Sequence, residues 1–254
     1  MSFAVSADAY DRFMGRYSAS LATEFADFAG VSAGQHLLDV GCGPGALTAE
    51  LVRRLEPSAI TAVDPSETFV AAVRERLPGV TVRTASAEAL PFPGNVFDVA
   101  LAQLVVHFMA DPVAGLAEMG RVVRPGGVVA ACVWDHAGGT GPLSIFWQAA
   151  HELDPDIEDE SELAGARRGH LSELLRNAGV REVEEARITT AVEHETFEDW
   201  WQPYTLGVGP AGVYAAGLDP RDRAELRERC KHLHPRAPFT VHASAWAARG
   251  VVSS

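Results

Sequence analysis

Residues 37–45, with the sequence LLDVGCGPG, form the segment with the clearest chemical meaning in this 254-residue chain. An apolar run ends in the acid Asp39 and passes into a loop with glycines at 41, 43 and 45, and a helix-compatible segment, 46–55, follows. A strand that turns sharply into a helix leaves backbone N–H groups unpaired at the turn, and glycine lets a ligand approach that backbone closely. The pattern predicts a nucleotide-type cofactor at the carboxyl end of a parallel sheet.

Two classes of cofactor fit this loop. Gly41, Gly43 and Ala46 satisfy the G-x-G-x-x-G/A pattern of dinucleotide binders. Asp64 lies about 20 residues further on, where an acid that binds ribose belongs. The carboxylate of Asp39 would repel a pyrophosphate, whereas it would attract a cationic amino group. S-adenosylmethionine (SAM) carries an ammonium and a sulfonium but no phosphate, so it suits this loop. A simple tight turn without a ligand is the third interpretation.

Composition limits the class of partner. The formal net charge is −13, from 21 basic and 34 acidic residues, so the clustered Lys and Arg of a nucleic-acid binder are lacking. The N-terminus has no apolar signal core, and no run of about 18 apolar residues occurs. We therefore expect a cytoplasmic protein that binds neither nucleic acid nor membrane. The three cysteines, at 42, 132 and 230, are too far apart for a disulfide framework or a C-x-x-C metal pair.

The elements that must position the loop alternate along the chain. Residues 1–35 carry aromatic side chains at spacings of three, four and seven, which predicts one or two amphipathic helices. Strands are then expected at 36–40, 59–63, 80–84, 96–102 and 128–134, and helices at 46–55, 67–77 and 112–123. Ser66 and Asp111 are the expected N-caps, and the turn residues 124–127 should end the last helix. Five such units predict a parallel sheet with helices on both faces and the glycine-loop strand at its centre.

The pattern changes after Trp134. We expect a glycine-rich loop at 135–140, helices at 141–151 and 169–178, and an exposed acidic segment at 154–162. Residues 181–193 and 239–251 alternate in polarity like strands, and helices should dominate residues 196–233.

Residues 36–134 resemble the class I SAM-dependent methyltransferases, particularly the small-molecule group of the ubiquinone and menaquinone biosynthesis type. Four segments carry the resemblance in family order: LLDVGCGPG at 37–45, AVDPS at 62–66, residues 85–108, and RVVRPGGVV at 121–129. The segment YDRFMGRYS at 10–18 is similar to the N-terminal cap of related members. The resemblance implies one α/β domain over residues 1–254 with a Rossmann-like, doubly wound, mostly parallel seven-stranded sheet. An N-terminal helical cap (1–35) would precede the SAM-binding core (36–134), and a helical lid insertion would accompany strands six and seven (135–254).

The same resemblance implies a role for particular residues toward SAM and its product, S-adenosylhomocysteine (SAH). Asp39 would favour the methionyl ammonium, and Asp64 would accept hydrogen bonds from both ribose hydroxyls. The remaining implied contacts are Gly41, Cys42, Gly43 and Gly45 at the amino-acid moiety, Pro65, Ser66, Ser86, Ala87 and Glu88 at the adenine, Gln103 at the sulfonium, and Arg16 and Tyr17 over the carboxylate. Many relatives carry Asp where this chain has Ser86. Either Glu88 or a backbone carbonyl then bonds the adenine amino group, or the affinity is lower.

Methyl transfer from a sulfonium asks the protein chiefly to align donor and acceptor and to exclude water, so no metal is expected. His107, just past the fourth strand, is the candidate general base, and the alternative is that it packs against the cofactor or caps the next turn. An apolar or aromatic acceptor pocket is predicted from Trp134, His136, Trp147, Trp200, Trp201 and Tyr204, although aromatics at helical spacing are also typical of a core.

The sequence therefore predicts a SAM-dependent methyltransferase that acts on a small, apolar or aromatic molecule. Two alternatives stay open. One is an NAD(P)-linked oxidoreductase, although the chain has a single lysine, Lys231, far from any motif and thus no Tyr-x-x-x-Lys arrangement for hydride transfer. The other is a SAM-binding module without catalytic activity.

Overall fold

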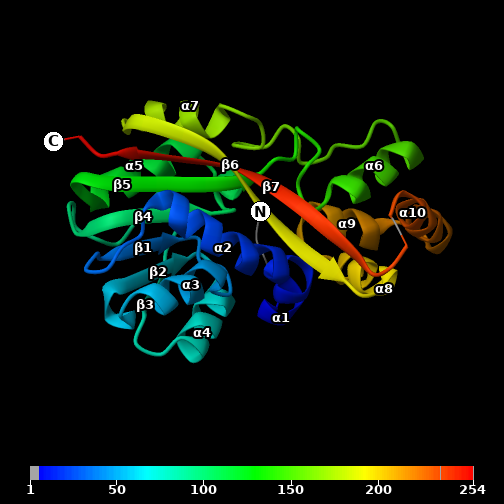
Figure 1. Cartoon of the computed structure of the whole chain (residues 1–254), viewed down its shortest axis with the longest axis horizontal. Coiled ribbons are helices and arrows are strands. Elements are labelled where there is room, and N and C mark those ends of the chain that lie inside the picture. The colour runs from blue at the N-terminus through cyan, green and yellow to red at the C-terminus, as the bar shows by residue number, and fades with distance from the viewer. Residues whose placement is uncertain (1–5, 235, 254) are drawn as a thin grey trace.

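A single mixed sheet organises the fold in the computed structural model, which describes residues 6–234 and 236–253 (Figure 1). Its strands are β1 (Leu37–Val40), β2 (Ile60–Asp64), β3 (Thr81–Thr84), β4 (Phe97–Gln103), β5 (Val123–Trp134), β6 (Arg181–His194) and β7 (Phe239–Val251), in the order β3-β2-β1-β4-β5-β7-β6. The first five are parallel, and β7 runs antiparallel to both β5 and β6. This confirms the Rossmann-like, mostly parallel seven-stranded sheet, and β1 occupies the central position expected of the glycine-loop strand.

Helices cover both faces of the sheet, because alternate strand residues point to opposite sides. Leu37 and Leu101 share one buried cluster with α2 (Arg16–Ala29) and α3 (Ala46–Arg54). Leu38 and Ala100 share the opposite cluster with α5 (Pro112–Val122) and α7 (His170–Asn177). A third cluster joins β2 and β3 to α4 (Glu67–Arg76). No helix of the described residues combines the length and the apolar character needed to span a membrane.

Four further helices, which we call the lid helices or the lid after their predicted role, lie beyond the carboxyl ends of the parallel strands. They are α6 (Ser144–Leu153), α8 (Phe197–Trp201), α9 (Gly209–Gly217) and α10 (Pro220–Leu233). β6 and β7 extend past the other strands and reach these helices, on the right of Figure 1. The N-terminal segment runs through α1 (Ala7–Tyr10), a π-helical turn (Asp11–Gly15) and α2. It agrees with the helices expected within residues 1–35, of which residues 1–5 lie outside the described part. The division of the chain into cap, core and lid stays a prediction.

Local sequence explains where these helices begin. The side chain of Ser66 accepts a hydrogen bond from the N–H of Phe69 at 3.4 Å, and that of Asp111 accepts one from the N–H of Ala114 at 3.0 Å. Each bond satisfies a donor that the first helical turn leaves without a backbone partner. Both predicted N-caps are confirmed.

Two expectations are wrong in detail. Residues 124–127 follow the end of α5 as expected, but they form a bulge within β5 rather than a separate turn, because the pairing with β4 jumps from Phe97↔Val123 to Val99↔Val128. Gly127 permits this, since a Cβ there would lie 2.5 Å from the carbonyl oxygen of Asp98 on β4, where the pairing register shifts. The acidic segment 154–162 is not fully exposed either. Glu160 is buried because Nε1 of Trp147 donates a hydrogen bond to its Oε2 at 2.8 Å.

Candidate functional site

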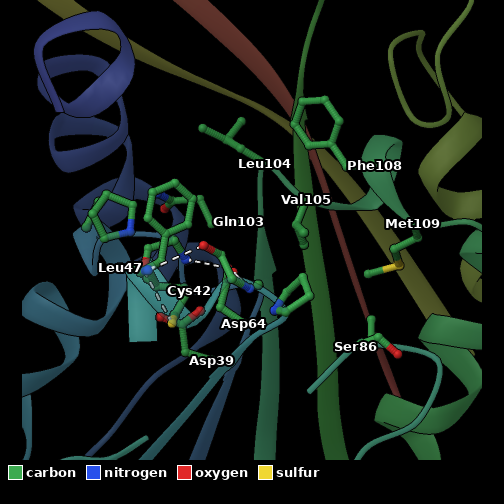
Figure 2. A pocket seen from close by; sticks show the side chains of 18 of the residues that line it. Asp39, Cys42, Leu47, Asp64, Ser86, Gln103, Leu104, Val105, Phe108 and Met109 are labelled. Carbon is green, nitrogen blue, oxygen red and sulfur yellow. Dashed lines mark hydrogen bonds between the residues drawn. The ribbon is translucent and has the colours of Figure 1, made fainter. Parts of the chain in front are cut away.

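A cavity of about 470 Å³ opens at the carboxyl ends of β1, β2 and β4, where the strand order reverses (Figure 2). This is the usual ligand position in an open α/β sheet, and the volume is that of a small-molecule site. We call it the main cavity. It brings together most of the predicted cofactor residues, namely Asp39, Gly41, Cys42, Gly43, Asp64, Pro65, Ser66, Ser86, Ala87, Glu88 and Gln103. Their individual roles stay predictions.

Two buried carboxyl groups mark the floor of the main cavity. Oδ2 of Asp39 accepts a hydrogen bond from Oγ1 of Thr48 at 2.6 Å, whereas its Oδ1 is buried without a partner among the described residues. Burial raises the pKa of Asp39 to about 7. Asp64 ends β2, and burial raises its pKa as well. A buried carboxylate oxygen without a donor calls for a hydrogen-bond donor or a cation from the ligand.

The glycine loop uses its own N–H groups, contrary to the expectation that they would stay unpaired. The N–H groups of Gly41 and Cys42 both donate to the carbonyl of Val63, at 2.8 and 2.9 Å. Gly43 donates to Oδ2 of Asp64 at 2.9 Å. The reason is the neighbouring strand: β2 ends level with the loop, so the carbonyl of Val63 and the side chain of the terminal residue, Asp64, reach these donors. These three N–H groups are therefore already used within the protein.

Close packing around the loop explains why positions 41 and 45 are glycines. A Cβ on Gly41, which has a φ of +71°, would lie 2.3 Å from Cγ2 of Val105, so the close approach requires glycine. A Cβ on Gly45 would lie 3.1 Å from Cγ2 of Val73 on α4. Gly45 does not line the main cavity, and its contact with the amino-acid moiety stays a prediction.

Glu88 lines the main cavity and forms hydrogen bonds with the backbone just before α5. Its Oε1 accepts hydrogen bonds from the N–H of Ala110 at 2.8 Å and from the N–H of Asp111 at 3.4 Å, immediately before α5. Ser86 and Met109 lie together on the same side of the cavity, opposite the two acids (Figure 2). Because Oε1 of Glu88 already accepts these backbone hydrogen bonds, it is less available for the predicted contact with the adenine amino group.

The N-terminal segment contributes different residues from those predicted. Arg16 donates to Oδ2 of Asp199 at 2.8 Å, and the Tyr17 hydroxyl is 2.8 Å from Nε2 of His194, so both face the lid and neither lines the main cavity. The main cavity is therefore lined without Arg16 and Tyr17, and their contact with the cofactor stays a prediction. Tyr10 and Ser18 line the cavity instead.

The π-helical turn accounts for the exchange. Tyr10 and Tyr17 are seven residues apart and would share one face of a regular α-helix. The intervening turn, Asp11–Gly15, has the wider π pitch, so the two tyrosines diverge. Tyr10 packs edge-on against Phe69 with the ring centroids 5.6 Å apart. The family resemblance pointed to the segment 10–18, and within that segment the structure places Tyr10, rather than Tyr17, at the main cavity.

A second cavity of about 40 Å³, the inner chamber, adjoins the main cavity: Tyr10, Leu104 and Phe108 line both. His107 lines the inner chamber, and burial lowers its pKa to about 3. Burial thus disfavours the protonated imidazole that a general base would form, and the catalytic role of His107 stays a prediction. His136 faces the same chamber, its ring centroid 6.2 Å from that of His107, and burial lowers its pKa to about 4.

The predicted aromatic acceptor pocket divides into two sets. Trp134 and His136 line the inner chamber. Trp147, Trp200, Trp201 and Tyr204 line neither the main cavity nor the inner chamber. They belong to a buried aromatic cluster in the lid, in which the Phe146 and Tyr204 rings stack 4.6 Å apart. Their spacing indicated core packing, as the sequence alternative allowed. No group of three or more His, Cys, Asp or Glu residues suited to a metal ion occurs among the residues that the structure describes.

Comparison with known proteins shows which proteins this chain is similar to. Residues 38–131 match a family model described as a methyltransferase domain. Over 154 residues the chain is 33% identical to 2-methyl-6-phytyl-1,4-hydroquinone methyltransferase 2 of Oryza sativa subsp. japonica, covering 60% of this chain and 40% of the relative. Over 103 residues it is 39% identical to the ubiquinone/menaquinone biosynthesis C-methyltransferase UbiE of Geobacter sulfurreducens, covering 38% of this chain and 40% of the relative. The chain thus spans about two fifths of the length of these relatives.

A solved structure extends the likeness over nearly the whole chain. The [4+2]-cyclase SpnF aligns with 93% of this chain and 82% of its own, with a TM-score of 0.59 at 21% identity, which shows a shared fold. The sequence matches lie in the core of the sheet. Residues 38–131 of this chain match the methyltransferase domain model, and the chain has the Rossmann-like fold of the class I methyltransferases.

Proposed function

We propose that this chain transfers a methyl group from SAM to a small, apolar or aromatic acceptor by in-line displacement. The observation that carries the proposal is the pairing of two buried acids with a loop in which the N–H groups of Gly41, Cys42 and Gly43 are already used. Such a site suits a ligand with an ammonium at one end and ribose hydroxyls at the other. None of the described residues that line the main cavity is a lysine or an arginine, so a pyrophosphate would meet two acids and no cation.

The chain's own residues would hold and orient the cofactor. Oδ1 of Asp39 would accept a hydrogen bond from the ammonium, while Thr48 fixes the other oxygen. Asp64 accepts one backbone bond on each oxygen, from Gly43 at 2.9 Å and Ser66 at 2.8 Å. Each oxygen keeps a further lone pair, so the carboxylate is held in place to accept from two vicinal hydroxyls. Bound SAM supplies an electrophilic methyl group on sulfur.

The acceptor side of the proposal rests on the inner chamber. Apolar side chains make up most of its lining and favour an apolar or aromatic acceptor beside it. They are Phe13, Met14, Leu104, Phe108, Trp134, Leu143 and Val208. The low basicity of His107 fits a reaction in which alignment matters more than a strong base.

The alternatives fit less well. A dinucleotide needs free N–H donors at the loop, and those of Gly41, Cys42 and Gly43 are bonded. A use of the fold without methyl transfer has one specific observation in its favour: SpnF, which shares the fold, is described as a cyclase. The experiment must therefore separate cofactor binding from turnover.

Calorimetric titration with SAH tests the cofactor, and a parallel fluorescence titration with NADH tests the main alternative. We expect saturable heat with SAH at one site per chain and no fluorescence change with NADH. Turnover is then followed as SAH released from SAM in the presence of a panel of small phenols, quinols and amines. Absence of SAH binding would contradict the proposal, and binding without turnover on any acceptor would favour the non-catalytic alternative.

Proton release on binding gives a second test, specific to Asp39. Burial raises the pKa of Asp39 to about 7 in the ligand-free protein, above its value in the unfolded chain. The folded protein is therefore less stable with Asp39 ionised than with Asp39 protonated. The ligand-free fold should accordingly lose stability as the pH rises from about 4 through about 7. An ammonium at Oδ1 favours the ionised form, so binding of SAH at pH 7 should release about half a proton.

The measurement is the heat of SAH binding in phosphate and in Tris, two buffers that differ widely in ionisation enthalpy. The wild-type heat should depend on the buffer, and that of Asp39→Asn, which cannot ionise, should lose this dependence. Identical heats in the two buffers for the wild type would place the ammonium elsewhere.

A further inference from the structure

The inner chamber holds polar atoms that the proposed function has not used. Nε1 of Trp134, Nδ1 of His107 and Nε2 of His136 are all buried, and none has a hydrogen-bond partner among the described residues. All three side chains line the chamber. Buried polar atoms in native proteins are nearly always paired, so three of them around one small space indicate a ligand group or water that pairs them.

The size of the chamber limits what can enter it. A volume of about 40 Å³ accommodates one functional group or a few water molecules, but not a whole acceptor. Tyr10, Leu104 and Phe108 line both cavities. The body of an acceptor would therefore lie between these three side chains, close to the main cavity, with one substituent reaching into the chamber.

Hydrogen-bonding capacity selects the substituent. Nε1 of Trp134 can only donate, so the group must be able to accept. His107 and His136 resist protonation because they are buried, so each neutral ring offers one donor and one acceptor. An ammonium cannot accept from the indole. A carbonyl or an ether can pair with a ring nitrogen only where that nitrogen carries the proton, whereas a hydroxyl accepts from the indole and pairs with a ring nitrogen in either tautomer.

Charge excludes the acidic groups that also accept hydrogen bonds. The described residues that line the chamber include neither lysine nor arginine, and they include the buried acid Glu160. Trp147 holds Oε2 of Glu160 at 2.8 Å and thereby fixes the carboxyl group in the wall. A carboxylate or a phosphate would be buried next to this group without a counter-ion, which is strongly unfavourable.

We propose that the inner chamber binds a neutral hydroxyl group of the methyl acceptor, which accepts a hydrogen bond from Nε1 of Trp134 and donates one to a ring nitrogen of His107 or His136. This specificity site rests on the proposed function, since it assigns the acceptor class as hydroxylated small molecules. It gives Trp134 the role of a specificity residue, whereas Trp147, Trp200 and Trp201 have structural roles.

Three probes of similar size test the inference: phenol, which donates and accepts, anisole, which only accepts, and toluene, which does neither. Their dissociation constants are measured by ligand-observed NMR, with and without saturating SAH. We expect phenol to bind the wild type at least about tenfold more tightly than toluene, a factor equivalent to about 1.4 kcal/mol, with anisole in between. This comparison needs no variant.

Trp134→Phe locates the effect. The substitution removes the indole donor and keeps an apolar ring, so phenol should fall to the level of anisole or below while toluene binding changes little. Trp201→Phe is the matched control, because Trp201 is buried in the lid and lines neither cavity, and it should leave the ratio of phenol to toluene unchanged. Thermal unfolding of each variant confirms that it is folded.

Equal binding of phenol and toluene to the wild type would overturn the inference, as would a preference for phenol that survives Trp134→Phe. Either result would assign the chamber to ordered water. The outcome is separate from that of the proposed function. Loss of SAH binding would refute the methyltransferase, but the preference for phenol would still be measurable without SAH.

Discussion

Gly41→Ala is expected to lower the unfolding temperature by roughly 5–15 °C and to abolish cofactor binding. Alanine at a φ of +71° carries a backbone strain of about 1–2 kcal/mol. Its Cβ would also meet the side chain of Val105 at 2.3 Å, and overpacking of this kind costs about 1–3 kcal/mol. Relief of the clash must move either the glycine loop or the segment after β4, and both line the main cavity. Differential scanning calorimetry and SAH titration measure the two effects.

Gly43→Ala is the matched control for backbone strain. Its φ is also positive, at +54°, but a Cβ there meets nothing within 4 Å. It should therefore lose only the smaller, conformational part of the stability. Adding Val105→Ala to Gly41→Ala removes the colliding methyl groups and should restore much of the lost unfolding temperature. If Gly41→Ala and Gly43→Ala unfold at the same temperature, the close contact with Val105 is not what requires glycine.

Asp64→Ala is expected to weaken SAH binding by about 1–3 kcal/mol, a factor of roughly 5 to 150. The substitution leaves both ribose hydroxyls without acceptors and frees the N–H groups of Gly43 and Ser66, which Asp64 now binds. Part of the affinity loss thus comes from disturbance of the loop. The affinity must therefore be compared with that of a variant that loses a similar amount of folding stability.

Asp98→Ala supplies that comparison. Asp98 is also buried and also accepts a backbone hydrogen bond, from the N–H of His36 at 2.7 Å, and it pairs with Arg124. It lies near the start of β4, at the amino ends of the parallel strands, whereas the main cavity lies at their carboxyl ends. Both variants should lose stability, but only Asp64→Ala should lose affinity for SAH. Equal affinity losses would show that Asp64 acts only through the fold.

Sequence pattern predicted the regular part of the fold well. The alternation of strands and helices up to Trp134, the caps at Ser66 and Asp111 and the central place of β1 all depend on local signals of polarity and capping. Such signals survive in any tertiary context that buries the apolar face. The main cavity follows from them, because the carboxyl ends of parallel strands meet at one edge.

What the sequence could not predict depends on contacts between distant segments. The π-helical turn placed Tyr10 rather than Tyr17 at the cavity, and spacing cannot reveal a change of helical pitch. Glu160 looked like part of an exposed acidic run, but it is buried against Trp147. The N–H groups of the loop looked free, because the sequence does not show that the end of β2 reaches them.

The central claim is that SAM lies across the ends of β1 and β2, with its ammonium at Asp39 and its ribose at Asp64. The crystal structure of the protein grown with SAH tests this most directly. We predict SAH in the main cavity, with both ribose hydroxyls within hydrogen-bond distance of Asp64 and the amino group within reach of Oδ1 of Asp39. SAH bound at any other place, or a main cavity that stays empty at saturating SAH, would contradict the account.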